Sequence, residues 1–315
     1  MPPSAPANAH RPRATASEQT PAADTPGAGV AAPMPPEPPP RDGYLPPEER
    51  YLDLMKRCLT RYGFDEDLMP VDPIPAWRKR AWPYLERLLA RHDWVVYRRT
   101  PYRPEDRQEG KDWPRNAETM IGLRRLDNLQ ACIEQVLADR VAGDLLEAGV
   151  WRGGAAIFMR AVLAARGDTD RLVWLADSFQ GLPKPDPKYE ADRGDDHWTK
   201  GRLAISLDEV RGNFERYQLL DDRVRFLPGW FNETLPTAPI DRLSVLRADG
   251  DMYGSTMDIL TALYPKLSVG GFAIIDDYGA VPGCRAAVTD YRAEHGITEP
   301  IEQIDWTGVF WRRQG

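Results

Sequence analysis

The feature that most constrains the fold is the alternation, from residue 144 onward, of short apolar runs with segments of helical spacing. Such runs predict buried parallel strands, and the segments between them predict the helices that cover a sheet. We therefore expect an α/β fold, a Rossmann-like doubly wound sheet whose C-terminal edge strand is antiparallel. The predicted strands are residues 145–150, 172–176, 224–227, 243–248 and 272–275, followed by a closing pair at 301–304 and 308–311.

The chain divides into three predicted regions. Residues 1–45 form a Pro- and Ala-rich arm, which we expect to be disordered because 12 of the 30 prolines lie in residues 1–42 and large apolar side chains are scarce. A secretory signal is not expected, and an organelle presequence is the weaker alternative. Residues 46–140 form an N-terminal helical lid region, and residues 141–315 form a cofactor-binding core. The predicted helices are residues 51–59, 77–92, 117–137, a helix ending at 165, then 203–217, 255–263 and 284–294.

Charge and composition argue against several classes of protein. A net charge of −7 disfavours a nucleic-acid binder, which would need a basic face. No stretch approaches the roughly 18 apolar residues of a membrane-spanning helix. The three cysteines, Cys58, Cys132 and Cys284, are odd in number and widely spaced, so we expect reduced thiols rather than a disulfide frame or a zinc site. We expect a cytoplasmic protein without nucleic-acid or membrane partners.

Four aspartates follow two of the predicted strands directly. Asp249 and Asp251 come after one apolar run, and Asp276 and Asp277 come after the next. Ligands of an open α/β sheet bind outside the carboxyl ends of the strands, and carboxylates gathered there repel one another unless a cation neutralises them. Because no His or Cys lies nearby in sequence, the set favours Mg²⁺ or Mn²⁺ over Zn²⁺. The Asp-x-Asp spacing lets Asp249 bind a metal while Asp251 faces a substrate. Capping of the following helices is the alternative role.

A glycine-containing turn follows the first predicted strand, with Gly149 at its start and Gly153 at its end. Its spacing is not G-x-G-x-x-G, which disfavours a nicotinamide-dependent oxidoreductase. Glu147 at the strand end would repel a pyrophosphate, but it suits the ammonium and sulfonium groups of S-adenosyl-L-methionine. An ion pair of Glu147 with Arg152 or another neighbouring arginine is the alternative.

Two further strand ends carry candidate cofactor contacts. Asp177 ends the second strand, a position from which a carboxylate reaches a ribose diol. Gly229, Trp230 and Phe231 follow the third strand, where an aromatic ring would stack on an adenine.

Several longer strings of residues have a more specific meaning. They are Tyr51-Leu-Asp-Leu, Asp112-Trp-Pro, residues 117–128, Glu147-Ala-Gly-Val-Trp-Arg-Gly-Gly, Asp177-Ser-Phe-Gln-Gly-Leu-Pro, Gly229-Trp-Phe, Asp249-Gly-Asp-Met-Tyr and Asp276-Asp-Tyr. Through these strings, residues 51–313 resemble the macrocin O-methyltransferase-type family, the sugar O-methyltransferases of antibiotic biosynthesis.

The resemblance implies a class I methyltransferase fold that uses S-adenosyl-L-methionine and Mg²⁺. It assigns Asp249, Asp276 and Asp277 as metal ligands and Asp251 as the general base. It also suggests a homo-oligomer, a dimer or higher, and offers no catalytic role for the N-terminal arm. The full set of expected cofactor-binding residues is Met120, Glu147, Gly149, Gly153, Asp177, Ser178, Gly229, Trp230 and Phe231.

We therefore expect an enzyme that methylates a deoxysugar hydroxyl of a glycosylated natural product. In this hypothesis Mg²⁺ holds two neighbouring sugar hydroxyls, and Asp251 removes the proton from the one that attacks the methyl group. The alternatives are methylation of a non-sugar hydroxyl of a secondary metabolite, and a non-catalytic binding protein with this fold. His197 is an alternative base, although its acidic, flexible loop favours a role as a lid over the substrate.

Overall fold

The computed structural model describes residues 45–64, 68–70, 82–92, 94, 96–99 and 102–315. Almost all of the predicted N-terminal arm therefore lies outside the described residues. The α-helices are α1 (Pro47–Thr60), α2 (Trp82–Ala90), α3 (Pro104–Glu109), α4 (Leu123–Ala138), α5 (Gly154–Ala165), α6 (Leu207–Arg216), α7 (Phe231–Thr234), α8 (Tyr253–Leu263) and α9 (Pro282–Glu294). Single turns of 3₁₀ helix are η1 (Glu190–Asp192), η2 (His197–Thr199), η3 (Gly201–Leu203), η4 (Leu235–Thr237) and η5 (Tyr264–Lys266).

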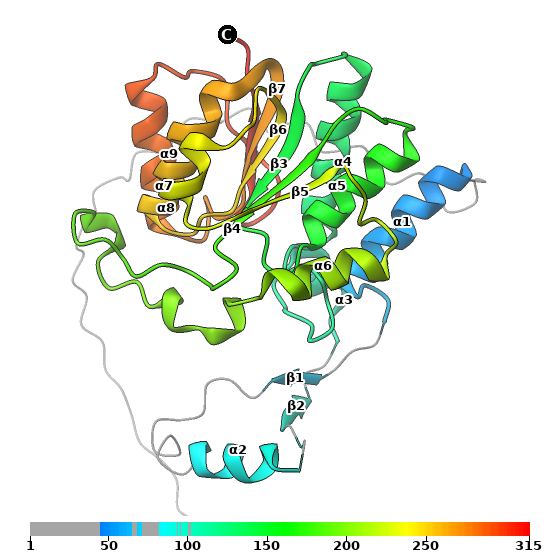
Figure 1. The fold of residues 1–315 in the computed structure, drawn as a ribbon, viewed down its shortest axis with the longest axis vertical. Helices are drawn as coiled ribbons and strands as arrows, with labels where there is room; N and C mark the ends of the chain where they lie inside the picture. Colours follow the sequence, from blue (N-terminus) through cyan, green and yellow to red (C-terminus); the bar gives the residue numbers. More distant parts are fainter. Residues whose placement is uncertain (1–44, 65–67, 71–81, 93, 95, 100–101) are drawn as a thin grey trace, which may run out of the picture. The chain divides into compact units, whose positions relative to one another are not determined.

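The strands form two sheets. β1 (Leu68–Pro70) and β2 (Tyr97–Arg99) make an antiparallel pair. The main sheet has seven strands in the order β5-β4-β3-β6-β7-β9-β8 (Figure 1). Its strands are β3 (Asp144–Ala148), β4 (Val173–Asp177), β5 (Val224–Pro228), β6 (Leu243–Ala248), β7 (Leu267–Ile275), β8 (Glu302–Gln303) and β9 (Val309–Arg312).

The topology of the main sheet confirms the expected doubly wound α/β fold with an antiparallel C-terminal strand. β5, β4, β3, β6 and β7 run parallel, and β9 runs against β7. One detail differs: β9 lies one position inside the edge, because the two-residue β8 pairs with its outer side. The strand order reverses between β3 and β6, and such a switch point is where ligands of these sheets bind.

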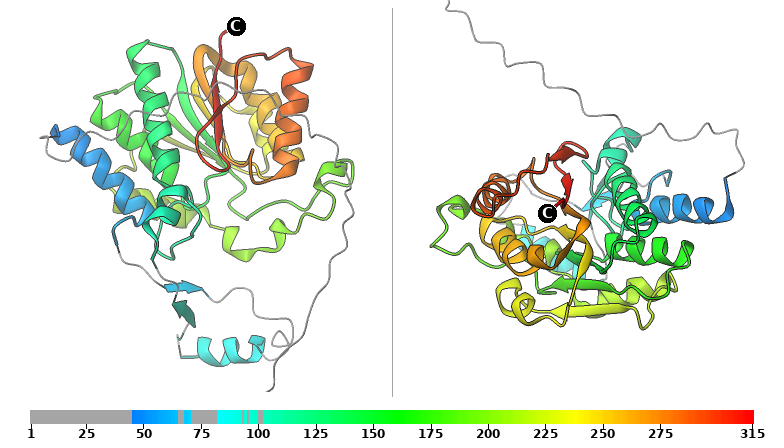
Figure 2. Two further views of the ribbon diagram at one scale, coloured as in Figure 1. Left: turned by 180° about the vertical axis from the view of Figure 1, so that it is seen from behind. Right: turned by 90° about the horizontal axis from the view of Figure 1, so that it is seen from above.

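The central strands bury both of their faces. Leu145 and Val245 point into one hydrophobic layer with α1, α4 and α5, whereas Leu146 and Leu246 point into a second layer with α8 and α9. Figures 1 and 2 show these two groups of helices on opposite faces of the sheet. Burial on both faces is the reason that the strands appear in the sequence as continuous apolar runs.

Helix α4 begins at Leu123 rather than at residue 117. The preceding residues are held out of the helix by contacts with other elements, and these contacts involve Glu118. Its N–H donates to the carbonyl of Leu59 (3.0 Å), and its carbonyl accepts from the N–H of Gly154 (2.9 Å). These contacts leave Met120 outside the helix, beside the site described below.

Helix α6 begins at Leu207 rather than at residue 203, because the hydroxyl of Ser206 caps it by accepting from the N–H of Glu209 (3.2 Å). Residues 178–206, which we call the β4–α6 loop, precede it and contain η1, η2 and η3.

The N-terminal region shares the core of the sheet. α1 and α4 pack against α5 within the first hydrophobic layer. α2 covers residues 82–90 of the helix predicted at 77–92, and residues 77–81 lie outside the described residues. The expected division at residues 45 and 140 stays a prediction. The three cysteines are unpaired, and none of the described helices has the length and apolar character needed to cross a membrane.

Candidate active site

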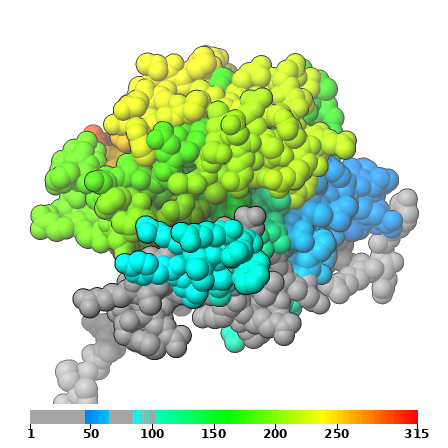
Figure 3. Space-filling view, turned by 60° about the horizontal axis from the view of Figure 1, so that its bottom comes forward, coloured from blue at the N-terminus to red at the C-terminus, as the bar shows by residue number. Residues whose placement is uncertain are grey.

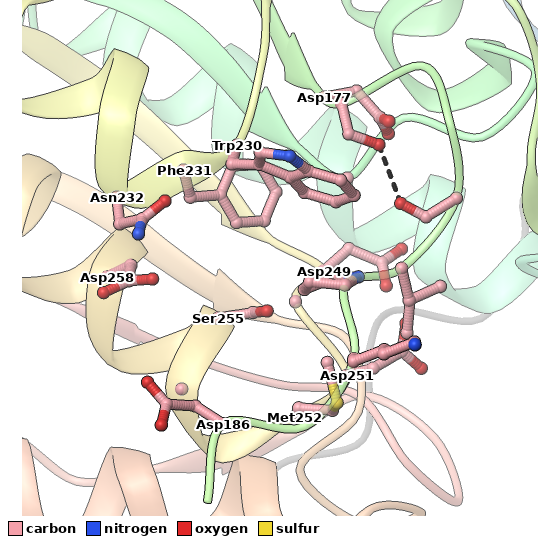
Figure 4. Close-up of a pocket in the computed structure, with 18 of the residues that line it drawn as sticks. Asp177, Asp186, Trp230, Phe231, Asn232, Asp249, Asp251, Met252, Ser255 and Asp258 are labelled. Carbon is pink, nitrogen blue, oxygen red and sulfur yellow. Dashed lines mark hydrogen bonds between the residues drawn. The ribbon is translucent and has the colours of Figure 1, made fainter. Parts of the chain in front are cut away.

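A cavity of about 320 Å³ lies at the carboxyl ends of β3, β4, β5 and β6, where the strand order reverses. Its size is typical of small-molecule sites. The β4–α6 loop and the first turn of α8 complete its wall. Figure 3 shows the surface that the β4–α6 loop and α6 form, in green to yellow-green, and Figure 4 shows the side chains inside.

Three carboxylates gather at this cavity. Asp249, Asp251 and Asp277 each bring one oxygen to within 4.8 Å of the others, and Asp249 and Asp251 line the cavity. We call these three residues the acidic trio. Asp251 has a left-handed backbone, with φ 54°, and its N–H donates to the carboxylate of Asp277 (3.3 Å). This conformation is uncommon outside glycine, and residues that adopt it cluster at active sites.

Burial raises the pKa of each carboxyl of the acidic trio, and the charges of neighbouring carboxylates raise it further. Arg247 opposes this effect at Asp249, and Lys200 of the β4–α6 loop opposes it at Asp251. Oxygen ligands that repel one another are the donor set that a hard divalent cation prefers. The acidic trio therefore fits an ion such as Mg²⁺.

Asp276 lies beside the acidic trio but is bound by two arginines. One oxygen accepts from Arg125 (2.5 Å) and the other accepts from Arg247. Burial acts to raise the pKa of Asp276, but the two guanidinium groups outweigh burial and lower it. The structure therefore groups Asp251, rather than Asp276, with Asp249 and Asp277. The expected role of Asp276 as a metal ligand stays a prediction.

A buried chain of alternating charges runs past the acidic trio. Arg247, near the end of β6, pairs with Glu147 (2.6 Å) and with Asp249 (3.0 Å) as well as with Asp276. Arg125 continues the chain from Asp276 to Asp305 (2.9 Å).

The position of Glu147 follows from this chain. Its expected alternative, an ion pair with an arginine, is present, and the partner is Arg247 rather than Arg152. Burial raises the pKa of Glu147, and the charge of Arg247 opposes that rise. Glu147 is not among the residues that line the cavity, so its expected contact with a cofactor stays a prediction.

The turn after β3 is shaped by contacts within the protein. Gly149 has φ +86°, and a β-carbon there would lie 1.9 Å from the carbonyl oxygen of Asp249. The carboxylate of Asp177 accepts from the N–H groups of Val150 (2.8 Å) and Phe179 (2.8 Å), so it ties the turn after β3 to the turn after β4. Gly149 and Asp177 both line the cavity.

Left-handed non-glycine residues follow three neighbouring strands. Trp151 (φ 46°), Phe179 (φ 55°) and Asp251 (φ 54°) lie in the turns after β3, β4 and β6. Three such residues around one cavity indicate that its rim is held in a conformation that the chain does not readily adopt.

Most of the expected cofactor residues share the cavity. In Figure 4 the rings of Trp230 and Phe231 lie above Asp249 and Asp251. Gly153 does not line the cavity: it is the N-cap of α5 and lies against Val210 of α6. The expected residues that do line it are Met120, Gly149, Asp177, Ser178, Gly229, Trp230 and Phe231.

His197 lies in the β4–α6 loop and does not line the cavity. Its Nδ1 atom is 2.9 Å and 3.0 Å from the two carboxylate oxygens of Asp195. The charge of Asp195 contributes to the raised pKa of Asp251, so this part of the loop lies near the acidic trio. The contact with Asp195 and the position outside the cavity lining favour a role for His197 within the β4–α6 loop over direct contact with a substrate.

Residues 48–313 match the family model described as macrocin-O-methyltransferase (TylF). The chain belongs to the macrocin-O-methyltransferase family. It is therefore an O-methyltransferase with the class I methyltransferase fold, as the sequence strings indicated, and membership of the family implies S-adenosyl-L-methionine as the cofactor.

Two O-methyltransferases of Streptomyces species are similar over most of the chain. This chain is 54% identical over 264 residues to the 8-demethyl-8-(2,3-dimethoxy-alpha-L-rhamnosyl)-tetracenomycin-C 4′-O-methyltransferase of Streptomyces olivaceus. The match covers 83% of this chain and 92% of the relative. The chain is 55% identical over 265 residues to the demethyldecarbamoylnovobiocin O-methyltransferase of Streptomyces niveus, covering 84% and 93%. The solved structure of the O-methyltransferase NovP matches with a TM-score of 0.73 and 47% identity, over 85% of this chain and all of NovP.

Several residues around the site of this O-methyltransferase were not expected from the sequence. Arg247 carried one signal: it interrupts an apolar strand, and a charge in a strand buried on both faces requires a partner. Arg125 carried none, because arginine is common on helices. The cavity-lining residues Asp192, Asn232, Ser255 and Asp258 carried none either.

Proposed function

We propose that this enzyme transfers the methyl group of S-adenosyl-L-methionine to a sugar hydroxyl of a glycosylated natural product, with Mg²⁺ as its metal and Asp251 as its general base. The observation that carries the proposal is that the acidic trio meets the same cavity that most expected cofactor residues line. One cavity thus has groups suited to a methyl donor and groups suited to deprotonating an alcohol. The S. olivaceus relative, which its name describes as a 4′-O-methyltransferase of a rhamnosyl tetracenomycin, supports a sugar acceptor.

The cofactor would supply a methyl group on a sulfonium. Asp177 lines the cavity at the end of β4, a position from which a carboxylate reaches a ribose diol. Trp230 and Phe231 offer aromatic faces to an adenine, and Met120 adds an apolar contact. Gly149 and Ser178 complete the proposed cofactor contacts. Glu147 and Gly153 would shape this end of the site from behind its lining.

We propose Asp249, Asp276 and Asp277 as the metal ligands. Each oxygen of Asp276 accepts from one arginine, and a carboxylate oxygen has two acceptor positions, so one position on each oxygen stays open to an ion. When bound, Mg²⁺ would lower the pKa of the acceptor hydroxyl by acting as a Lewis acid.

Asp251 is the proposed base because of its place in the acidic trio. Asp249 and Asp251 line the cavity, whereas Asp276 and Asp277 do not. Of Asp249 and Asp251, Asp249 is paired with Arg247. Asp251 is thus the carboxylate that would accept the proton of a hydroxyl bound in the cavity.

The proposal is tested by incubating the purified enzyme with S-adenosyl-L-methionine and MgCl₂ and a panel of glycosides, each paired with its aglycone. We expect mass spectrometry to find one added methyl group on a glycoside, on its sugar fragment, and we expect EDTA to abolish transfer until Mg²⁺ is restored. Methylation of the aglycones would replace the sugar acceptor by a non-sugar hydroxyl. Full activity in EDTA would exclude the metal.

Three further expectations from the sequence stay predictions. They are the homo-oligomeric state, the cytoplasmic location and the absence of nucleic-acid and membrane partners.

A further inference from the structure

The β4–α6 loop is fastened to the turn that carries Asp251 through one buried carboxylate. Asp192, at the end of η1, is 3% exposed. One of its oxygens accepts from the N–H of Tyr253 (2.7 Å), and the other accepts from the N–H of Gly254 (2.9 Å). Both donors lie in the first turn of α8, directly after Asp251 and Met252.

The first turn of α8 lacks a cap of its own. Its N-cap residue is Met252, whose side chain makes no capping hydrogen bond. The first N–H groups of a helix have no partner within the helix, and a carboxylate near them is stabilised by the helix dipole. Asp192 supplies this cap from 61 residues away in the chain. The cap of α8 therefore forms only when the β4–α6 loop is docked.

The docking surface is closely packed around Asp192. A β-carbon on Gly283 would lie 2.8 Å from an oxygen of Asp192, and one on Gly254 would lie 2.9 Å from the ring of Tyr189. The rings of Tyr189 and Tyr253 pack with their centroids 5.0 Å apart. The loop thus fits against α8 and α9 in one defined position.

The docked loop also forms part of the cavity wall. Lys184, Lys188, Tyr189 and Asp192 line the cavity together with Asp251. A movement of the loop away from α8 would therefore open the cavity and remove the support of the turn at Asp251.

We propose that Asp192 is a positioning residue for methyl transfer. It closes the β4–α6 loop over the cavity and, through the N–H groups of Tyr253 and Gly254, holds the Asp251 turn in its left-handed conformation. This inference rests on the proposed role of Asp251. It adds a link between closure of the loop and assembly of the catalytic group.

The test uses the full-length enzyme with Asp192→Ala and Asp192→Asn, and Asp196→Ala as the matched control, because Asp196 is exposed in the same loop. The first readout is tryptic cleavage in the loop, with and without S-adenosylhomocysteine. The second is kcat and KM for S-adenosyl-L-methionine, with the acceptor found in the screen above. The loop offers tryptic cleavage sites after Lys188, Arg193, Lys200 and Arg202.

We expect Asp192→Ala to speed cleavage of the loop about tenfold, because its undocked state becomes more populated. We expect kcat to fall about 100-fold with KM for the cofactor nearly unchanged, because a small misplacement of a catalytic group has an effect of this size. Asp192→Asn should lie between wild type and Asp192→Ala, because its amide retains one acceptor oxygen. Asp196→Ala should behave as wild type.

Two results would overturn the inference. One is that both Asp192 variants match Asp196→Ala in the rate of tryptic cleavage and in kcat. The other is faster cleavage with normal kcat, which would leave Asp192 with a structural role alone. If Asp192→Ala does not fold, Asp192→Asn gives the same comparison. A wild-type enzyme without methyl transfer would instead contradict the proposed function, and the cleavage readout would still report on docking.

Discussion

The backbone of Gly149 lies directly against the backbone of Asp249, so closely that a β-carbon on Gly149 would stand 1.9 Å from the Asp249 carbonyl oxygen. Gly149 belongs to the turn proposed to hold the cofactor, and Asp249 belongs to the acidic trio. The cofactor turn and the acidic trio are therefore in backbone contact, and we expect a change in one to displace the other.

Gly149→Ala tests this contact. The new methyl group would push the Asp249 carbonyl away, so we expect the affinities for S-adenosylhomocysteine and for Mg²⁺ to fall together, each by at least about tenfold. Isothermal titration calorimetry measures both. Gly167→Ala is the matched control: Gly167 also has a positive φ (+68°), but no atom lies within 4 Å of its β-carbon position. Loss of only one of the two affinities would contradict the coupling.

Asp251→Asn tests the role of the general base separately from the roles of the metal ligands. A general base contributes about 10²- to 10⁴-fold, so we expect kcat to fall within that range while S-adenosylhomocysteine still binds. Asp277→Asn should instead lower the affinity for Mg²⁺. Steady-state kinetics and calorimetry give the comparison. Near-normal turnover of Asp251→Asn would remove Asp251 as the base.

Binding of Mg²⁺ should depend on pH in a defined direction. Burial, with the charges of neighbouring carboxylates, raises the pKa of Asp249, Asp251 and Asp277, so protons compete with an ion for these groups up to a higher pH than for ordinary carboxyls. Affinity should therefore rise as pH increases from about 6 to about 8, and binding should release protons. Calorimetry in buffers of different ionisation enthalpy measures the release. An affinity that stays constant over this range would disprove the effect.

Two neighbouring arginines provide a stability test. Arg125 is buried and pairs with Asp276 and Asp305, whereas Arg124 is 52% exposed and pairs with Glu109. Removing one partner of a buried pair leaves an uncompensated charge, so we expect Arg125→Met to lower the free energy of unfolding by about 3–5 kcal/mol. Arg124→Met should change it by less than about 1 kcal/mol. Urea denaturation followed by fluorescence measures both, and equal effects would refute the role of the buried chain.

The strands, and the strand ends that carry the aspartates, could be predicted because they depend on residues that are neighbours in the sequence. A strand buried on both faces must be apolar along its length, and the polar residue that ends it then lies at the ligand edge of the sheet. Asp177 and Asp249 were located in this way. The same argument could not say that Asp276 would be paired with arginines, because Arg125 comes from a helix 151 residues away in sequence.

Contacts between distant segments also explain the errors at helix ends. The apolar spacing of residues 117–137 predicted a single helix, yet the hydrogen bonds that Glu118 donates to Leu59 and accepts from Gly154 hold its first residues apart. Glu147 illustrates the same limit, since its partner Arg247 lies on the neighbouring strand. The spacing of apolar residues indicates which face of a helix or strand is buried. It does not indicate which distant group lies opposite that face.

The left-handed residues Trp151, Phe179 and Asp251 have a practical consequence for engineering. Valine, isoleucine and threonine are poorly tolerated at such positions, so these substitutions would strain the turns that form the site. Libraries aimed at new acceptors should leave these turns intact. They should diversify cavity-lining positions such as Lys184 and Leu203, where φ is not constrained in this way.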